Sequence, residues 1–355
     1  MSDAENTCCQ APLYLPASEI TRPDADFRNC CRNCHQKFDI ENVPPFTHFA
    51  CPHCRAELLV PKLFGDYWLL GRLPAAGTAE IYSALDPLLD REVVIKLAPV
   101  IRHDQERTAV CRKRLYYDAQ VQTQLEHPNS VEIYRCGNLD DRDFKMMENF
   151  SGGNVIFSPD PAVRTDPVLI LSALSETVSL LETASEFRVP HGAISPKHMM
   201  FNDEGALKLL NFRPIDEAIL PAPHAEFIYF APERLLNYDQ SPAGDIYSLG
   251  VILFRLFTDR HPFAPVENLT ELDLVNKQQR NPVPGMKSLC EFHDDALFSL
   301  IHAMLAPRPE DRPTFAELAK GFAAAAEKLA RKRNLKLAVS RLAQRIRQNL
   351  TEATS

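Results

Sequence analysis

Four cysteines near the N-terminus constrain the fold of this chain more tightly than any other local pattern. The stretch CRNCHQKFDIENVPPFTHFACPHC gives Cys31-x2-Cys34, sixteen intervening residues and then Cys51-x2-Cys54. This spacing is typical of a zinc site with four thiolate ligands, in which each Cys-x2-Cys knuckle presents two sulfurs to one tetrahedral ion. We expect a hairpin between the knuckles. A piece of about thirty residues buries little core, so metal binding, about 10 kcal/mol or more, would fold it.

The segment around these cysteines, residues 29–62, resembles a zinc ribbon. Two alternatives remain open, namely a pair of disulfides and a redox-active Cys-x2-Cys motif. The absence of a basic, apolar leader before the cysteines favours a cytoplasmic protein, where thiols stay reduced. Ribbons of this kind bind nucleic acid or protein, or cap a fold. The ribbon holds few basic residues, among them Arg32, Lys37 and Arg55, so we do not expect it to bind nucleic acid.

Beyond the ribbon, the apolar pattern changes from strand-like to helical along the chain. Short apolar runs such as YWLLGRL, AEIYSAL and REVVIKLAPV predict strands, and residues 105–126 predict one helix among them. After residue 150 the pattern is mostly helical, with DIYSLGVILFRLF apolar nearly all round and therefore buried. The sequence predicts an α+β fold with two lobes, a small antiparallel sheet lobe and a larger helical lobe. The expected domains are a disordered segment 1–28, the ribbon 29–62, lobes 66–150 and 151–327, and a basic helix 328–355.

From about residue 66 to residue 326, a series of short motifs occurs in the order found in protein kinases. They are VVIK, LEHPNSVEIY, MMEN, HGAISPKH, NFR, FAPE, DIYSLG and PEDRPT. On these motifs the chain resembles a bacterial-type Ser/Thr protein kinase domain. The resemblance implies that Asp245 braces the backbone of the catalytic loop and that Glu233 and Arg312 form a buried ion pair. These three residues would be structural.

The positions that carry the chemistry of that family hold other residues here. The resemblance places Ala193 at the catalytic aspartate, Ser195 at the following lysine and His198 at the asparagine that binds magnesium. Asn211 and Arg213 stand for the aspartate and glycine of the DFG motif. A methyl group accepts no proton, and a positioned base contributes about 10²–10⁴ in rate. Magnesium prefers oxygen ligands that carry negative charge. Imidazole offers only nitrogen, and the amide of asparagine offers an oxygen without the charge. No catalytic residue is intact, and magnesium binding is not expected.

The nucleotide site is altered as well. Pro74, Ala76 and Ala79 stand at the three glycines of the phosphate loop, and proline has no N–H to donate to a phosphate. Asp118 stands where the helix glutamate would pair with Lys96, and a structural salt bridge is as good an interpretation as a nucleotide clamp. ATP binding therefore stays open. The degenerate nucleotide site implied by the resemblance comprises Leu73, Ile81, Val94, Lys96, Asp118, the gatekeeper Met147 and Asn211.

The activation segment lacks the usual switch residues. From Phe212 to Pro232 there is no Ser or Thr, which leaves Tyr229 as a phosphorylation site. Glu226 stands at the threonine that helps to seat a substrate, and Gly192 replaces the arginine that would receive an activating phosphate. Activation by phosphorylation in the manner of the family is not expected.

The C-terminal part is basic in an otherwise acidic chain. Residues 328–350 hold eight Lys or Arg and no acid, so the rest of the chain sums to −8 − 8 = −16. An apolar stripe at helical spacing runs along the same stretch, formed by Leu335, Val339, Leu342, Ile346 and Leu350. Three interpretations stay open: a helix packed on the helical lobe, a self-associating coil, and a docking helix for an acidic partner. The longest apolar run, SLGVILF, is too short to cross a bilayer.

These observations favour a pseudokinase, a kinase-shaped scaffold or regulatory module that binds a protein partner in the cytoplasm. Its expected cofactor is zinc, and weak nucleotide binding would not depend on magnesium. The first alternative is an atypical active Ser/Thr kinase that recruits magnesium through other acids, with Asp203 and Glu204 the nearest. The second is a zinc-ribbon protein that binds nucleic acid and uses the kinase-like lobes as a platform.

Overall fold

The computed structural model describes residue 31 and residues 33–37, 43–73, 80–150, 166–202, 204, 206–214, 224–289 and 294–352. The chain divides into two compact units. The first comprises the chain up to Leu97 together with Asn138–Met146, and the second comprises Ala98–Gly137 and the chain from Met147 onward. The expected disordered segment 1–28 lies outside the described residues.

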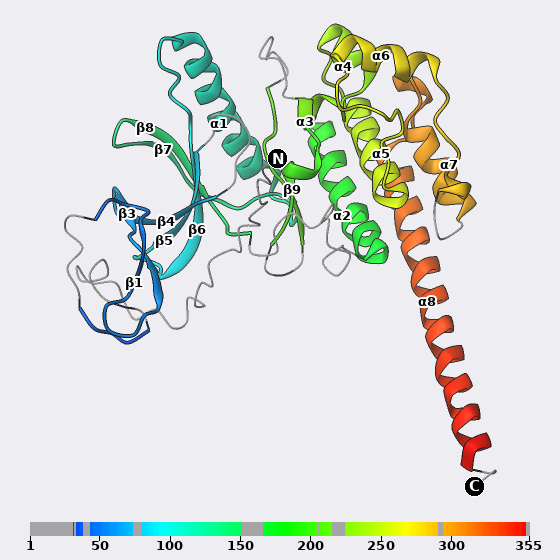
Figure 1. The fold of residues 1–355 in the computed structure, drawn as a ribbon. Coiled ribbons are helices and arrows are strands. Elements are labelled where there is room, and N and C mark those ends of the chain that lie inside the picture. Colours follow the sequence, from blue (N-terminus) through cyan, green and yellow to red (C-terminus); the bar gives the residue numbers. More distant parts are fainter. Residues whose placement is uncertain are drawn as a thin grey trace, which may run out of the picture. The chain divides into compact units, whose positions relative to one another are not determined.

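The first unit holds the cysteine-containing segment and most of a six-stranded sheet. The segment contains the hairpin β1 (His48–Ala50) and β2 (Glu57–Leu59), which pair antiparallel. The sheet has the order β3-β4-β5-β6-β8-β7 (Figure 1). Its strands are β3 (Lys62–Phe64), β4 (Tyr67–Leu73), β5 (Glu80–Asp86), β6 (Arg91–Leu97), β7 (Ile133–Leu139) and β8 (Arg142–Met147).

Tight turns and aromatic packing shape the edge of this sheet. Gly65 joins β3 to β4 with a φ of 54°, a conformation that glycine adopts without strain. A Cβ at this glycine would lie 2.4 Å from a methyl group of Leu139, so the position also lacks space for a side chain. Phe64 packs edge-on against Phe144 of β8, with ring centroids 5.5 Å apart. The short strand β3 thereby becomes part of the sheet, although no strand was predicted there from sequence.

The second unit is mainly helical. Its helices are α1 (Gln105–Leu125), α2 (Pro167–Glu186), α3 (His224–Phe227), α4 (Pro232–Asn237), α5 (Pro242–Thr258), α6 (Glu271–Arg280), α7 (Asp295–Met304) and α8 (Phe315–Glu352). Short 3-10 turns lie between them in the described part of the chain, at Pro196–His198, Met286–Ser288 and Pro309–Asp311. Strands β9 (Met199–Phe201) and β10 (Leu207–Leu209) form a hairpin. The HGAISPKH motif precedes this hairpin, and the NFR motif follows it. The expected α+β architecture is confirmed.

Local sequence signals explain where several helices begin. Asp104 caps α1 by accepting the Arg107 N–H at 2.9 Å. In α6, Thr270 and Asp273 form a reciprocal capping box. Helix α5 begins with Pro at its first position, where the missing N–H costs nothing. Most of its residues are buried and none is exposed. The prediction of a buried helix at this place is confirmed.

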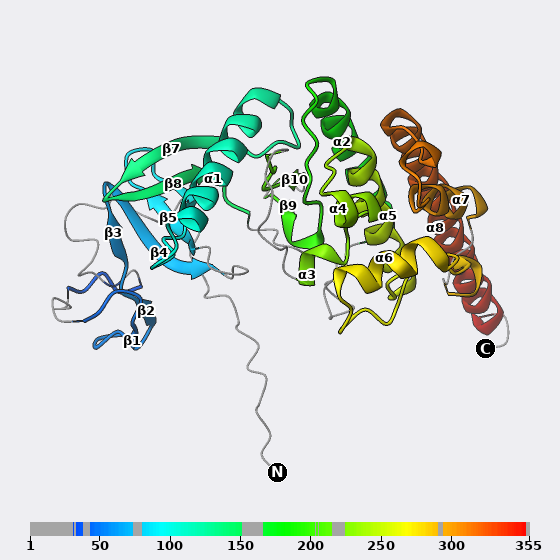
Figure 2. The same cartoon turned by 90° about the horizontal axis from the view of Figure 1, so that it is seen from above.

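Helix α2 is, within the described residues, one helix long and apolar enough by composition to cross a membrane. Several of its side chains belong to the main core of the second unit, among them Ile170, Leu171, Leu174 and Val178. The same helix packs along α8 (Figure 2). This packing gives α2 the environment of a core helix.

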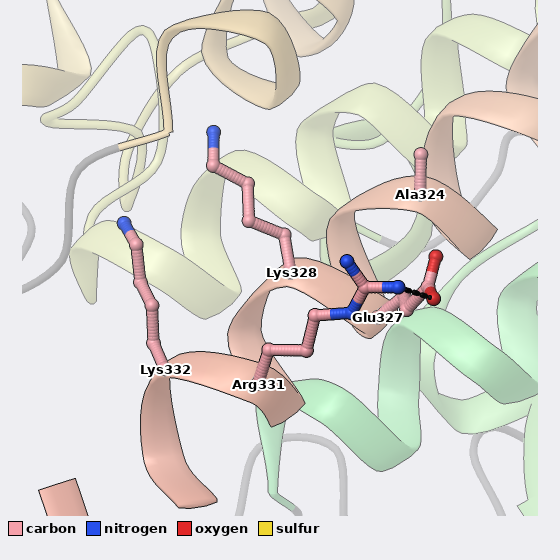
Figure 3. Close-up of a pocket in the computed structure, with 5 residues that line it drawn as sticks. All are labelled: Ala324, Glu327, Lys328, Arg331 and Lys332. Atoms are coloured by element: carbon pink, nitrogen blue, oxygen red, sulfur yellow. Dashed lines mark hydrogen bonds and ion pairs between the residues drawn. The ribbon is translucent and has the colours of Figure 1, made fainter. Parts of the chain in front are cut away.

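Helix α8 is continuous from Phe315 to Glu352. A separate basic helix was expected to begin at residue 328, and the structure shows no break there. Its first half packs on the core through Phe315, Leu318 and Phe322. Further along, Lys328 pairs with Asp294 at 2.9 Å, and Arg333 pairs with Asp166. Figure 3 shows the basic side chains on this stretch, with Arg331 turned toward Glu327. Lys328, Arg331 and Arg333 thus pair with acids of their own unit, which agrees with the interpretation of a helix packed on the lobe for this part of α8.

Candidate functional site

The four predicted metal ligands lie together. The sulfurs of Cys31, Cys34, Cys51 and Cys54 all lie within 4.8 Å of one another. The sulfur of Cys31 lies 3.6 Å from that of Cys54, and the sulfur of Cys34 lies 3.8 Å from that of Cys51. A regular tetrahedron with Zn–S bonds of 2.3 Å has sulfurs about 3.8 Å apart. None of the four thiols is joined in a disulfide. The separations of the sulfurs give the cluster the size of a four-thiolate zinc site.

Both knuckles share one backbone design. The N–H of His35 donates to the carbonyl of Cys31 at 2.8 Å, and the N–H of Arg55 donates to that of Cys51 at 3.0 Å. His35 and Arg55 both take positive φ angles, 56° and 67°. The hairpin β1–β2 encloses the second knuckle, so the prediction of a hairpin between the two knuckles is wrong in its position. The two knuckles therefore match each other in geometry, as expected if they serve one ion.

Polar donors favour the thiolate form at Cys54, whereas burial and the neighbouring sulfurs raise the pKa of the thiols of Cys31 and Cys34. The side-chain amide of Asn33 donates to the sulfur of Cys54 at 3.4 Å and lowers the pKa of that thiol to about 6. The N–H of His53 donates to the sulfur of Cys51 at 3.4 Å. His35 and His53 are themselves exposed. The donor set fits zinc, which prefers thiolates.

The first unit also gathers four residues of the implied nucleotide site. In the β4–β5–β6 register, Leu73 lies opposite Ile81, and Ile81 lies opposite Lys96. Directly opposite residues share one face of a sheet, and Val94 shares it with Lys96 because side chains alternate. Leu73, Ile81, Val94 and Lys96 thus form one patch on the small sheet. Met147 ends β8 and is buried, and with Asp118 and Asn211 it belongs to the second unit.

In the second unit, Asp245 braces the loop that precedes β9. Its carboxylate accepts the N–H of His191 at 2.7 Å and the N–H of Gly192 at 2.9 Å. Burial raises the pKa of Asp245 to about 7, and the two backbone donors oppose this rise. Gly192 has a φ of 69°, and a Cβ there would lie 2.1 Å from Oε1 of Gln240. The loop is therefore built around a glycine at the place where the resembled family has arginine.

Ala193 and His198, which stand at the base and metal-ligand positions, contact each other. The Nδ1 of His198 donates to the carbonyl oxygen of Ala193 at 2.7 Å. Burial lowers the pKa of His198 to about 3, so the imidazole is neutral at pH 7. The Ala193 side chain is buried at 1% exposure and offers only a methyl group. Neither position carries charge.

Asn211 and its neighbours hold the other altered positions. Asn211 has a φ of 68°, in the left-handed region that asparagine tolerates better than most residues. The next residue, Phe212, donates its N–H to the buried carboxylate of Asp118 at 2.7 Å. Asp118 of α1 therefore holds the backbone of the Asn-Phe-Arg segment.

A group of three charged side chains, not expected from the sequence, joins the catalytic loop to the activation segment; Glu226 and Arg213 are buried and Lys197 is partly exposed. Glu226 of α3 forms ion pairs with both Lys197 and Arg213. Although burial raises it, the positive charges of Arg213 and Lys197 bring the pKa of Glu226 down to about 2. Lys197 and Glu226 are 29 residues apart in the sequence, so no local pattern signals this contact. We call Lys197, Arg213 and Glu226 the buried triad, after the buried carboxylate that the two cations share.

The expected structural pair forms in full. Arg312 donates to both oxygens of Glu233 at 2.6 and 2.8 Å, and also to the carbonyls of Ala243, Ala306 and Pro307. Tyr229, the one candidate phosphorylation site in its segment, is buried, with its hydroxyl bonded to Arg255. Phosphorylation of Tyr229 would first require this part of the chain to open.

The side chains at the two metal-ligand positions do not fit magnesium. They offer one neutral imidazole, whose Nδ1 is already used, and one neutral amide. Magnesium binds carboxylates and other hard oxygen ligands. Nearby, the buried triad has two cations for one anion, so it adds positive rather than negative charge.

Comparison with known proteins identifies the larger part of the chain. A family model described as "Protein kinase domain" matches residues 73–321. Among similar proteins, the probable serine/threonine-protein kinase pknA2 of Bifidobacterium longum is 28% identical over 275 residues, 75% of this chain and 35% of its own length. The serine/threonine-protein kinase PrkC of Bacillus subtilis is 28% identical over 235 residues, 63% of this chain and 35% of its own length. The chain thus spans about a third of the length of these relatives.

Proposed function

The chain belongs to the protein kinase family, and from that premise we propose that it is a catalytically impaired member that acts as a scaffold or regulatory module. The observation that carries this proposal is the neutral state of three positions, Ala193, His198 and Asn211. Phosphoryl transfer depends on positioning and on neutralising charge through metal ions. A methyl group, a neutral imidazole and an amide supply neither a base nor an anionic metal site.

The buried triad supports the same proposal. Glu226 ties the activation segment to the catalytic loop through Lys197 and Arg213. Breaking such a buried pair costs about 3–5 kcal/mol. If binding of a substrate required Lys197 or Glu226 to move, the binding free energy would have to offset the cost of breaking these ion pairs.

The three residues expected to stabilise the large lobe make their structural contacts, which agrees with a domain that keeps the kinase fold without the chemistry. Asp245, Glu233 and Arg312 make the contacts described above. We infer that the module binds a protein partner in the cytoplasm and that the four cysteines bind zinc. Self-association through α8 remains a further outcome, which the oligomeric state in solution would reveal.

The direct test restores the missing groups. Ala193→Asp, His198→Asn and Asn211→Asp are combined and assayed beside the wild type for transfer of the γ-phosphate of ATP to the protein itself and to generic substrates. Restored turnover above that of the wild type supports the proposal. Wild-type turnover that equals the restored level and is lost in Lys96→Ala overturns it.

A second candidate is an active Ser/Thr protein kinase, and the comparisons favour it, because the relatives carry the names of serine/threonine-protein kinases. Such activity would use ATP and magnesium held by other acids. It predicts transfer that disappears in Lys96→Ala, which the same assay measures. Nucleic-acid binding by the ribbon has little support, because Lys37, Arg55 and Lys62 are the basic residues among its described positions.

A further inference from the structure

An aromatic contact joins the cysteine-containing segment to the kinase sheet. The ring of Phe46 stacks on the ring of Tyr82 of β5, with centroids 5.5 Å apart and planes 17° from parallel. Tyr82 is 6% exposed. Phe46 therefore shields the ring of Tyr82 from water. The ribbon packs against the sheet through this contact.

Phe46 is held in place by the ribbon. Its backbone has a φ of 65°, which is unfavourable for a bulky residue. Its N–H donates to the carbonyl of Val60 at 2.8 Å, and the N–H of Val60 donates to Thr47 at 3.1 Å. A strained residue of this kind persists only where its surroundings fix it. Here the surroundings are the hairpin that carries Cys51 and Cys54.

A short link continues from the ribbon into the sheet. β2 ends at Leu59 and β3 begins at Lys62, so only Val60 and Pro61 separate them. Both are buried. β3 then pairs with β4, with Leu63 opposite Trp68. Disorder in the hairpin would therefore reach β3 within two residues.

Polar contacts carry the connection further along the sheet. The hydroxyl of Tyr82 donates to Glu80 at 2.9 Å, and Arg142 of β8 donates to the same carboxylate at 2.8 Å. Glu80 is the first residue of β5 and follows directly on the segment that corresponds to the phosphate loop. The position of Phe46 thus bears on the start of β5.

We propose that the metal bound by the four cysteines is a structural cofactor of the small sheet and clamps β3 and β5 through Val60 and Phe46. Metal loading fixes the hairpin β1–β2, which fixes the strained Phe46 against Tyr82. Loss of the metal releases both contacts and loosens the edge of the sheet, while the helical unit keeps its order. This inference holds whether or not the protein transfers phosphate.

The experiment compares amide hydrogen exchange of the full chain with Zn²⁺ bound and after removal of the metal by a chelator under reducing conditions. We expect faster exchange in peptides that cover 43–73 and 80–86, unchanged exchange in α5, and recovery when Zn²⁺ is returned. Faster exchange limited to residues 31–59 would overturn the proposal. Failure of the protein to bind one equivalent of Zn²⁺ would overturn it too.

A matched pair of variants isolates the aromatic contact. Phe46→Ala with zinc bound should speed exchange at the start of β5 by about twofold to tenfold, the range for loss of one aromatic pair. Phe187→Ala removes an exposed ring of the helical unit and should leave β5 unchanged. If Phe46→Ala does not take up zinc, Phe46→Leu keeps the apolar volume and serves in its place. Exchange in β5 equal to that of the wild type in a zinc-loaded Phe46 variant would contradict the clamp.

Discussion

The Nδ1 of His198 donates to the carbonyl oxygen of Ala193 at 2.7 Å, so the residues at the metal-ligand and base positions are bonded to each other. The imidazole is buried and neutral, with a pKa of about 3. A side chain in this state neither attracts a divalent cation nor accepts a proton readily. The contact turns two former chemical positions into part of the packed core.

His198 should make the protein sensitive to acid. Its folded pKa of about 3 lies below the value of 6.5 in the unfolded chain, so the unfolded chain binds the proton first as pH falls. Stability from this group is complete above pH 6.5 and is lost as pH falls toward 3. By pH 5 the loss is about 2 kcal/mol. Urea unfolding of wild type and His198→Asn at pH 7 and pH 5 measures it.

The His198→Asn variant should lose about 2 kcal/mol less than the wild type between these two pH values. Asp245, His191 and His261 titrate in the same range, but they are present in both proteins and cancel in the difference. An equal pH dependence for the two proteins would show that His198 is not buried in its neutral form.

Glu226 should be essential to the stability of the helical unit. Glu226→Gln leaves Lys197 and Arg213 without their buried anion, which costs about 3–5 kcal/mol. In a unit of this size, this lowers the Tm by about 6–20 °C. The control Glu310→Gln changes an exposed glutamate and should stay within about 0.5 kcal/mol of wild type. Thermal unfolding of the two variants side by side tests the triad, and equal Tm values would count against it.

Arg312 should not be replaceable by lysine. Its guanidinium reaches both oxygens of Glu233 and three carbonyl groups, and one ammonium cannot make these contacts together. We expect Arg312→Lys to cost about 3 kcal/mol or more in unfolding free energy. Arg308→Lys changes an arginine whose side chain is 75% exposed and should have little effect. Urea unfolding that ranks the two variants equally would contradict the role of Arg312.

The motifs predicted the fold well because each one marks a fixed place in the chain. YWLLGRL coincides with β4, the helix expected at 105–126 is α1, and DIYSLGVILFRLF lies in the buried helix α5. The spacing of Cys31, Cys34, Cys51 and Cys54 in the sequence was enough to predict that their sulfurs cluster. In these cases local pattern and tertiary structure agree, as they do in sequences that fold to one structure.

Contacts between distant segments were harder to predict. Lys197 and Glu226 are 29 residues apart, and no periodic pattern relates them. The strand β3 is only three residues long and depends on the Phe64–Phe144 contact, which the sequence does not reveal. The sequence showed a cluster of basic residues at the start of the tail but did not indicate which acids they contact. The structure pairs Lys328 with Asp294.

Binding of ATP with and without magnesium tests the central claim most directly. Thermal unfolding of the full chain is followed with ATP plus Mg²⁺ and with ATP plus EDTA, for wild type and for Asn211→Asp. With neutral groups at positions 193, 198 and 211, any wild-type shift should be the same in both conditions. A wild-type shift that requires Mg²⁺, and that Asn211→Asp does not increase, would contradict this account of the site.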